Sequence, residues 1–358
     1  MLTNDRPKKF GFCPKPFEYL AVHNRGIGRV CCGDWLETPI GDLRRGSFDD
    51  LWNSQTAQDI RKSILDGSYK YCNQETCPAL IQGTLKRADQ IHDEFLRDVI
   101  DNQRVVLEKG PRTLSLTYDS TCNLKCPSCR SDFISLKGKQ YQEAEELQAR
   151  IFKEGLADVE ELVLTGYGDP FASRLFRKLL QSLDARDFPR LSIKLMTNGL
   201  LFTPAMWSSL EKIQSAVSSV EVSIDAATAE TYAINRGGSF KKLLENLSFI
   251  SGLLRQGKVD WFEISFVVQT NNFREMKQFV EMGRKYRCNR ILFQRLIRWD
   301  DTYTNRQFRT IAIHDPKHPD HQEFLDLLND PIFHFPPVDL SNLENLTASR
   351  FRSANLFR

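Results

Sequence analysis

The stretch Cys122-Asn123-Leu124-Lys125-Cys126-Pro127-Ser128-Cys129 decides how the rest of the chain is interpreted. It places three thiols, spaced C-x3-C-x2-C, directly after an apolar run that ends at Tyr118. Three thiolates on a loop leaving a strand can converge on one soft metal centre. Cubane iron–sulfur clusters take four thiolates, so a triplet leaves one iron open to another ligand. The alternative is a zinc knuckle or a disulfide pair, although closed zinc sites use four protein ligands and paired C-x2-C units.

Four segments of the chain, in order, resemble the motifs of the radical S-adenosylmethionine (SAM) enzymes. The cysteine triplet resembles the signature of that family, and residues 162–170 (LVLTGYGDP) resemble its Gly-rich stretch. Residues 196–199 (MTNG) resemble its "TNG" turn. Residues 222–226 (VSIDA), with Arg236-Gly237-Gly238 just after, resemble the family's fourth-strand region, which holds the SAM ribose and carboxylate. The resemblance covers residues 111 to about 300.

The resemblance implies that Cys122, Cys126 and Cys129 hold a [4Fe–4S] cluster, whose open iron binds the amino and carboxylate groups of SAM. In this family the cluster supplies an electron that cleaves SAM to methionine and a 5'-deoxyadenosyl radical. The residues expected to bind SAM are Gly166, Gly168, Asp169, Asn198, Ser223, Asp225 and Arg236.

Each of these residues also has an ordinary structural interpretation. Gly166 and Gly168 allow close backbone approach to a ligand, and Asp169 is expected to accept from the SAM ammonium group. The same residues are also typical of a simple strand-to-helix turn. Asn198 is either a turn residue before Gly199 or a polar contact in the mouth of the site.

Ser223 and Asp225 lie two residues apart on a predicted strand, so both side chains point to the same face and can line a barrel. Ser223 suits the ribose hydroxyls. Arg236 suits the methionyl carboxylate, since a planar guanidinium matches a planar acceptor. Most arginines are merely solvated, so the prediction for Arg236 depends on its place after the fourth strand.

From residue 113 onward, short apolar strands alternate with longer amphipathic stretches. Six βα repeats of this kind predict an α/β fold, a partial (β/α)6 TIM-like barrel, whose functional residues lie at the carboxyl ends of the strands. The motifs named above follow such ends. The predicted strands are Leu114–Tyr118, Leu162–Thr165, Leu191–Met196, Val220–Ile224, Phe262–Val268 and Ile291–Leu296.

The first 80 residues predict a small Cys-rich α+β lobe with a β-hairpin that returns one thiol beside another. The spacing from Cys13 through Gly26 to Cys31 resembles the start of a SPASM or "twitch" domain, placed here before the barrel. That resemblance implies an auxiliary [4Fe–4S] cluster with ligands Cys13, Cys31, Cys72 and Cys77. A structural zinc ion suits the same four thiolates and remains an alternative.

Cys32 is left over beside the auxiliary ligands, and two interpretations remain open. It is either a small buried hydrophobic residue or the catalytic hydrogen-atom donor facing the substrate, a role that needs only a reachable S–H group.

The predicted domain organisation has four parts. Residues 1–80 form the auxiliary-cluster lobe, and residues 81–110 form a charged helical connector that Pro111 ends. Residues 111–300 form the radical SAM barrel, and residues 301–358 form a tail whose apolar residues around Phe324 pack as a last helix on the barrel.

Bulk composition restricts the location and the partners. The chain has 358 residues, with 49 basic and 46 acidic ones and a net charge of +3, so no nucleic-acid or membrane partner is expected. The start of the sequence lacks an apolar signal core, which predicts a cytoplasmic protein. The nine cysteines in such a chain favour reduced thiols and metal ligation over disulfides.

The sequence therefore predicts a radical SAM enzyme that abstracts a hydrogen atom from a small-molecule, sugar or peptide substrate. An oxidation follows if the auxiliary cluster accepts an electron, and an epimerisation follows if Cys32 or another donor returns a hydrogen atom. We expect a reductant such as flavodoxin or ferredoxin as partner. The alternative class is a non-catalytic, zinc-binding scaffold or binding module.

Overall fold

The computed structural model describes residues 11–298 and 302–347. The predicted N-terminal stretch before residue 11 and the end of the predicted tail from residue 348 lie outside the described residues. The chain divides into two compact units. Unit 1 comprises Met1–Tyr118 and Gln142–Glu160, and unit 2 comprises Asp119–Tyr141 and Glu161–Arg358.

Unit 1 contains the Cys-rich lobe and the first predicted barrel strand. Its strand order is β4-β1-β2-β3, with β1 antiparallel to β2 and parallel to β4. The predicted hairpin is therefore confirmed. Its elements are α1 (Lys15–Glu18), β1 (Tyr19–His23), β2 (Ile27–Arg29), β3 (Gly41–Asp42), α2 (Phe48–Trp52), α3 (Gln55–Leu65), α4 (Pro78–Ile81), α5 (Glu94–Asp101) and β4 (Thr113–Thr117).

The connector differs from the prediction, because residues 81–110 do not form one charged helix. A helix forms only at α5, where the Asp93 side chain caps the N-terminus by accepting from the Leu96 backbone N–H (2.9 Å). Gly83 and Gln103 both adopt positive φ, at 64° and 51°, which a continuous helix does not permit. The turns at these positions therefore interrupt the helix that the apolar spacing of residues 81–110 predicted.

Arg61 organises the packing of unit 1, since it is fully buried in α3. Its guanidinium donates to the carbonyl oxygens of Pro16 (2.9 Å), Trp52 (2.9 Å) and Val105 (2.8 Å). It also lies over the Trp52 ring at 4.4 Å. Burial lowers the pKa of Arg61 to about 9, and these carbonyl groups replace the water that the cation has lost.

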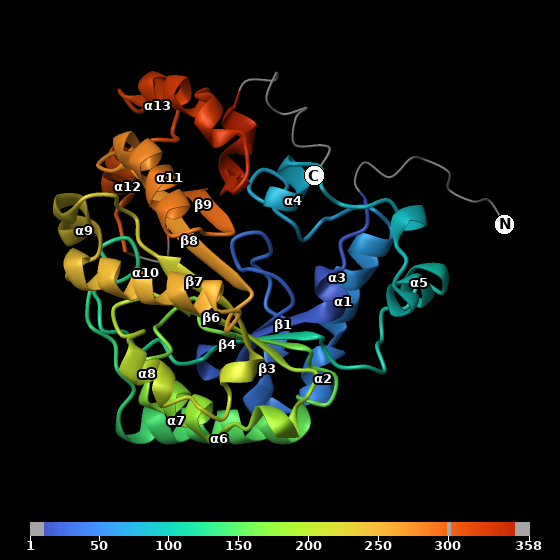
Figure 1. The fold of residues 1–358 in the computed structure, drawn as a ribbon. Coiled ribbons are helices and arrows are strands. Elements are labelled where there is room, and N and C mark those ends of the chain that lie inside the picture. The colour runs from blue at the N-terminus through green and yellow to red at the C-terminus, as the bar shows by residue number, and fades with distance from the viewer. Residues whose placement is uncertain (1–10, 299–301, 348–358) are drawn as a thin grey trace. The chain divides into compact units, whose positions relative to one another are not determined.

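Unit 2 contains an open sheet of parallel strands in chain order, β5 to β10 (Figure 1). Together with β4, strands β5 to β9 are the six predicted barrel strands, so the predicted α/β class with mostly parallel strands is confirmed. The strands are β5 (Glu161–Leu164), β6 (Ser192–Thr197), β7 (Val217–Ser223), β8 (Trp261–Val268), β9 (Arg290–Arg295) and β10 (Val338–Asp339).

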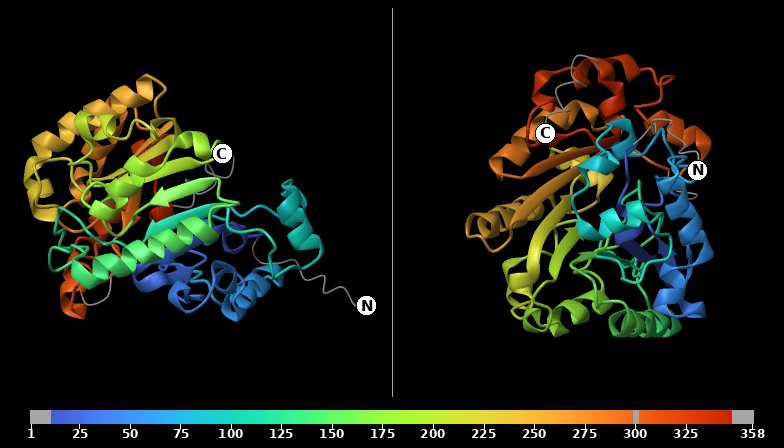
Figure 2. Two further views of the ribbon diagram at one scale, coloured as in Figure 1. Left: turned by 90° about the horizontal axis from the view of Figure 1, so that it is seen from below. Right: turned by 90° about the vertical axis from the view of Figure 1, so that its right-hand side faces the viewer.

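Amphipathic helices alternate with these strands. Helix α10 packs on β8 and α11 on β9, and the C-terminal segment with α13 lies next to α11 (Figure 2). Aromatic rings of Phe266, Phe279 and Phe293 lie within 5.6 Å of one another in this core. The helices are α7 (Arg174–Ser182), α8 (Pro204–Ser208), α9 (Ala229–Asn235), α10 (Phe240–Arg255), α11 (Met276–Lys285), α12 (Asn305–Ile311) and α13 (His321–Leu328), while α6 (Gly138–Glu154) belongs partly to each unit.

A charged layer crosses the sheet of unit 2. Glu221 on β7 pairs in register with Glu263 on β8, and Lys194 on β6 bridges them at 2.9 and 3.1 Å. Burial raises the pKa of Glu221 to about 7, and the neighbouring carboxylate adds to this rise while Lys194 opposes it. One layer further along the strands, Ser265 donates to Ser223 (3.1 Å).

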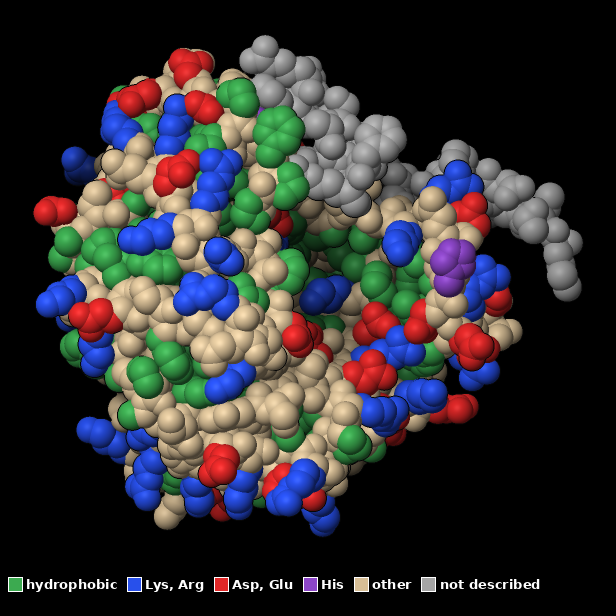
Figure 3. Space-filling view, in the orientation of Figure 1, with side chains coloured by type: hydrophobic (Ala, Val, Ile, Leu, Met, Phe, Trp, Pro, Cys, Tyr) green, Lys and Arg blue, Asp and Glu red, His purple; other side chains and the backbone are tan. Residues whose placement is uncertain are grey.

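On the molecular surface, basic and acidic side chains are interspersed over the face shown in Figure 3, in agreement with the net charge of +3. None of the described helices is long and apolar enough to cross a membrane.

Candidate metal centres

The cysteine loop follows β4 and is held by backbone hydrogen bonds within unit 2. The Cys122 N–H donates to the Ile134 carbonyl (3.2 Å), and the Cys129 N–H donates to the Cys126 carbonyl (2.9 Å), which closes a turn. Asp119 holds the start of the loop, because it accepts from the Thr121 N–H (2.8 Å) and from the Ser173 hydroxyl (2.5 Å). The loop is therefore fixed before any ligand binds.

Each thiol of the triplet receives one side-chain N–H group from a different residue. Asn198 Nδ2 lies 3.7 Å from Cys122 Sγ, and Arg236 Nη1 lies 3.7 Å from Cys126 Sγ. Arg130 Nη2 lies 3.4 Å from Cys129 Sγ. Two of these donors are cationic. Hydrogen bonds and positive charge at the sulfurs favour thiolates and the reduced form of a cluster.

The Gly-rich loop after β5 lies against the cysteine loop. A Cβ on Gly168 would lie 2.7 Å from the Asp119 carbonyl oxygen and 2.8 Å from that of Thr121, so this position has no room for a side chain. A Cβ on Gly166 would meet nothing closer than Met196 Cε, at 3.9 Å. Close backbone approach is thus required at Gly168, and the neighbouring surface is the protein's own loop.

Asp169 does not fit the predicted direct contact with the SAM ammonium group. Its side chain is fully buried, and its carboxylate accepts from the backbone N–H groups of Phe171 (3.0 Å) and Ala172 (3.1 Å). The other oxygen accepts from the Thr197 hydroxyl (2.7 Å) and the Asn198 N–H (2.9 Å). These four bonds saturate the carboxylate, so Asp169 ties the end of β5 to the end of β6 and positions Asn198.

Asp225 and Arg236 form a buried ion pair of 2.7 Å just beyond β7. Asp225 has a φ of 58°, and its other oxygen accepts from the Val267 N–H (2.7 Å) on β8. Burial raises the pKa of Asp225, and the adjacent guanidinium opposes this shift. Arg236 thus links the carboxylate of Asp225 to the sulfur of Cys126. The structure brings together the cysteine triplet, Asn198, Asp225 and Arg236.

Three buried polar atoms near the carboxyl ends of β7 and β8 have no hydrogen-bond partner among the described residues. They are Arg236 Nε, the Tyr232 hydroxyl and Gln269 Nε2. Orphaned buried donors are rare in folded proteins and indicate a missing ligand or water. A zwitterionic ligand such as SAM supplies acceptors for such groups. No sequence pattern pointed to Tyr232, and Arg130 was indicated only by its place directly after Cys129.

In unit 1, the four predicted auxiliary ligands surround one small cavity. The remainder of the lining is mostly apolar, and Cys32 is not part of it. Burial raises the pKa of Cys13 to about 11 and of Cys72 to about 12, so both thiols stay protonated until a metal displaces the protons. The lining residues are Cys13, Pro16, Cys31, Trp35, Leu36, Ile64, Tyr69, Cys72, Cys77, Ala79, Leu80 and Leu85.

Cys32 is half-buried and its thiol donates to Asp34 Oδ2 (3.5 Å). Burial and the adjacent Asp34 carboxylate raise the pKa of Cys32 to about 12. The thiol therefore keeps its S–H group, which a hydrogen-atom donor needs.

A zinc ion and a cubane cluster require different spacings of their thiolates. A tetrahedral zinc ion holds its thiolates at about 2.3 Å, which places the sulfurs roughly 3.8 Å apart. In a cubane cluster each thiolate binds a separate iron, so the ligands are spread further apart. Among residues 11–298 and 302–347, no three His, Cys, Asp or Glu side chains are arranged to hold one metal ion.

The fold and the two thiol sets define a class of protein: an α/β protein of mostly parallel strands with a three-cysteine loop after the first predicted barrel strand. Residues 120–282 match the model of the radical SAM superfamily. Residues 13–78 match the model of SPASM, an iron–sulfur cluster-binding domain. The chain thus carries a radical SAM domain and a SPASM domain, which confirms the predicted family and its cofactors: SAM, a SAM-binding [4Fe–4S] cluster and auxiliary iron–sulfur cluster binding.

Solved structures with a similar chain include other radical SAM proteins. SuiB of Streptococcus suis bound to precursor peptide SuiA is 14% identical with a TM-score of 0.41, and the match covers 68% of this chain and 53% of that chain. Native anSMEcpe with bound AdoMet is 21% identical with a TM-score of 0.43, and the match covers 62% of this chain and 60% of that chain. A comparison with curated proteins finds no match. The family assignment rests on the two domain matches.

Proposed function

We propose that this protein reductively cleaves SAM and uses the resulting radical to abstract a hydrogen atom from a small-molecule, sugar or peptide substrate. The observation that carries the proposal is the cysteine triplet, in which each sulfur has its own N–H donor while orphaned donors lie nearby. A structural zinc knuckle needs no such arrangement at the carboxyl edge of a parallel sheet.

The residues of unit 2 have separate roles at this centre. Cys122, Cys126 and Cys129 hold the cluster, which when bound supplies the electron that cleaves SAM. Arg236 orients its free Nε toward a ligand carboxylate, because Asp225 fixes the other side of its guanidinium. Ser223 accepts from Ser265, so its own hydroxyl proton is available to a ribose oxygen. At Gly166 a Cβ would meet Met196 at 3.9 Å, an ordinary contact distance, so the absence of a side chain there is assigned to close backbone approach by the ligand.

Unit 1 contributes the second centre. Cys13, Cys31, Cys72 and Cys77 hold the auxiliary cluster in an enclosure whose other walls are mostly apolar, which limits access of water. Because each of the four irons is then bound by a thiolate, this centre has no open position for SAM.

The fate of the substrate radical decides between two outcomes. If Cys32 gives its thiol hydrogen atom to the substrate, the product is an epimer. If the substrate loses a further electron, the product is oxidised. The protonated thiol of Cys32 supports the first outcome. A Cys32→Ala variant that still forms 5'-deoxyadenosine but no longer incorporates solvent deuterium into the product would establish epimerisation. Full turnover by that variant would remove Cys32 from the mechanism.

The decisive experiment is iron, sulfide and zinc analysis after anaerobic reconstitution, with reductant-dependent 5'-deoxyadenosine formation assayed alongside. We expect about eight irons per chain, falling to about four in Cys122→Ala/Cys126→Ala/Cys129→Ala, with deoxyadenosine formation lost. A colourless protein with stoichiometric zinc and no deoxyadenosine would overturn the proposal and leave a zinc-binding scaffold.

A further inference from the structure

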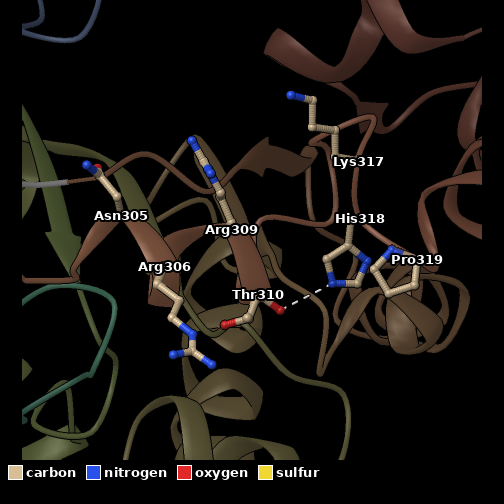
Figure 4. A pocket seen from close by; sticks show the side chains of 7 residues that line it. All are labelled: Asn305, Arg306, Arg309, Thr310, Lys317, His318 and Pro319. Carbon is tan, nitrogen blue, oxygen red and sulfur yellow. Dashed lines mark hydrogen bonds between the residues drawn. The ribbon is translucent and has the colours of Figure 1, made fainter.

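Helix α12 and the loop that follows it form a basic surface pocket in unit 2. Arg306 and Arg309 extend from α12 and Lys317 from the loop (Figure 4). We call these three residues the basic patch. The remaining lining residues are Asn305, Thr310, His318 and Pro319, so the lining contains no carboxylate.

The basic patch has no acidic partner within the described part of the chain. None of its three cations takes part in an ion pair there, in contrast to the exposed Arg274, which pairs with Glu323. The carboxylate of Asp315 caps the loop by accepting from the Lys317 backbone N–H (2.9 Å) and does not line the pocket. A comparable surface pocket beside α10 contains Lys241 and Lys242, but Glu245 accompanies them.

The basic patch is anchored at the carboxyl edge of the sheet. Thr270, just after β8, donates from its hydroxyl to the Thr310 carbonyl (3.1 Å) and from its N–H to the Ile311 carbonyl (3.0 Å). His318 is buried, and its Nε2 lies 2.9 Å from the same Thr270 hydroxyl. The loop and α12 are therefore both fixed to the end of β8.

The end of β8 also connects to the groups around the cysteine triplet. Asn271, next to Thr270, donates to Asn235 Oδ1 (2.7 Å), and Asn235 donates to the Asp225 carbonyl (2.9 Å). Asp225 in turn pairs with Arg236, whose Nη1 lies 3.7 Å from Cys126 Sγ. Hydrogen bonds therefore link the segment that anchors the basic patch to the residues of the cysteine triplet.

The geometry of the cations decides what kind of anion they suit. Their side chains point in different directions and do not converge on one point (Figure 4). Each is exposed, so solvent screening leaves a single small anion with little affinity for any one of them. An acidic protein surface meets all of them at once, and the summed field accelerates its association.

We propose that the basic patch of Arg306, Arg309 and Lys317 is the docking surface for an acidic one-electron donor protein of the flavodoxin or ferredoxin type. The inference rests on the proposed function, because SAM cleavage consumes one electron that the chain does not supply itself. The donor is oxidised by one electron and the centre held by the cysteine triplet is reduced by one; no covalent bond forms between the partners.

The test compares two reductants on reconstituted holoprotein under anaerobic conditions. We expect Arg306→Glu/Arg309→Glu/Lys317→Glu to slow reduction by flavodoxin hydroquinone about tenfold or more at low salt, and to flatten its salt dependence. Titration with flavodoxin, followed by calorimetry, should show the same loss of affinity without any turnover. Reduction by dithionite, a small molecule that needs no docking surface, should be unchanged.

Lys241→Glu/Lys242→Glu on α10 is the matched control and should leave the flavodoxin rate unchanged. The inference is wrong if the variant with all three charges reversed is reduced by flavodoxin at a rate, and binds it with an affinity, within about twofold of the parent. It is also wrong if dithionite reduction slows equally, since the centre itself is then damaged. A wild-type protein that forms no deoxyadenosine with dithionite refutes the proposed function, whereas calorimetry still reports on docking.

Discussion

Gly168 packs against the cysteine loop so closely that the smallest side chain cannot fit. In Gly168→Ala the new Cβ would lie 2.7 Å from the Asp119 carbonyl oxygen, so the loop must move. We expect a loss of about 1 to 3 kcal/mol in the free energy of unfolding, typical of overpacking. We also expect a loss of about four irons per chain, because the displaced loop carries the three cysteines that we propose as cluster ligands. Iron analysis and denaturant unfolding measure the two effects.

Gly166→Ala is the matched control two residues away. Its Cβ would meet Met196 Cε at 3.9 Å, an ordinary van der Waals distance. Iron content and stability should stay close to those of the parent. Equal effects of the two substitutions would show that the close approach at Gly168 is not what holds the cysteine loop.

A substitution at Asn198 tests how hydrogen-bond donors on side chains affect the reduction potential of the cluster at the cysteine triplet. Asn198→Asp keeps the oxygen that accepts from the Leu200 N–H (3.1 Å) but loses the N–H group that faces Cys122 Sγ. We expect the reduction potential of the cluster at the cysteine triplet to become more negative, because one hydrogen bond to sulfur is lost and a negative charge is added. A redox titration followed by electron paramagnetic resonance measures it. An unchanged or more positive potential would contradict this role.

At the site, the sequence indicated where the cysteine triplet and Asn198 lie, but it did not indicate the contacts that support them. The cysteine triplet and Asn198 follow strand ends, and that placement was readable from the alternation of strands and motifs. The role of Asp169 was not, because its four donors come from chain positions up to 29 residues away. A saturated buried carboxylate and a ligand-binding one look the same in a sequence.

Elements with strong periodicity were predicted well. The six barrel strands fall where the apolar runs placed them, since buried parallel strands give nearly continuous apolar sequence. The apolar residues from Phe48 to Ile64 have the spacing of one helical segment, whereas Asn53 and Ser54 divide this stretch into α2 and α3. Ser54 caps α3 by accepting from the Ala57 N–H (3.3 Å). Caps and positive φ angles decide boundaries that periodicity does not reveal.

The charged layer across β6, β7 and β8 predicts a pH dependence of stability. The folded state raises the pKa of Glu221 to about 7, above the value of about 4.3 in an unfolded chain. Between these values the folded protein binds more protons than the unfolded one. The free energy of unfolding should therefore fall as the pH rises from about 4.5 to about 7, by about 1 to 3 kcal/mol from this group.

Glu221→Gln removes the titrating group while keeping an oxygen for Lys194, which lies 2.9 Å from the Glu221 carboxylate. We expect this part of the pH slope to disappear in urea unfolding measured at several pH values. Glu281→Gln, which removes one exposed carboxylate from α11, is the control for charge alone. A slope that persists in Glu221→Gln would assign the titration to another group.

At the scale of the molecule, each thiol set lies inside one unit. Cys13, Cys31, Cys72 and Cys77 belong to unit 1, and the triplet belongs to unit 2. Substituting the four unit 1 cysteines with alanine should remove about four irons and leave dithionite-driven 5'-deoxyadenosine formation intact. Loss of all iron in this variant would show that the two centres do not assemble independently.

The carbonyl shell of Arg61 determines how much chain the N-terminal lobe needs to fold. This shell draws on chain positions as distant as Pro16 and Val105, and no carboxylate within residues 11–298 and 302–347 pairs with the cation. A fragment ending at residue 80 would lose the Val105 carbonyl and leave Asn53 Oδ1 (3.1 Å) as the remaining acceptor of Nη1. We therefore expect such a fragment to be less stable than one that extends past residue 105, although it contains every cysteine of the auxiliary site.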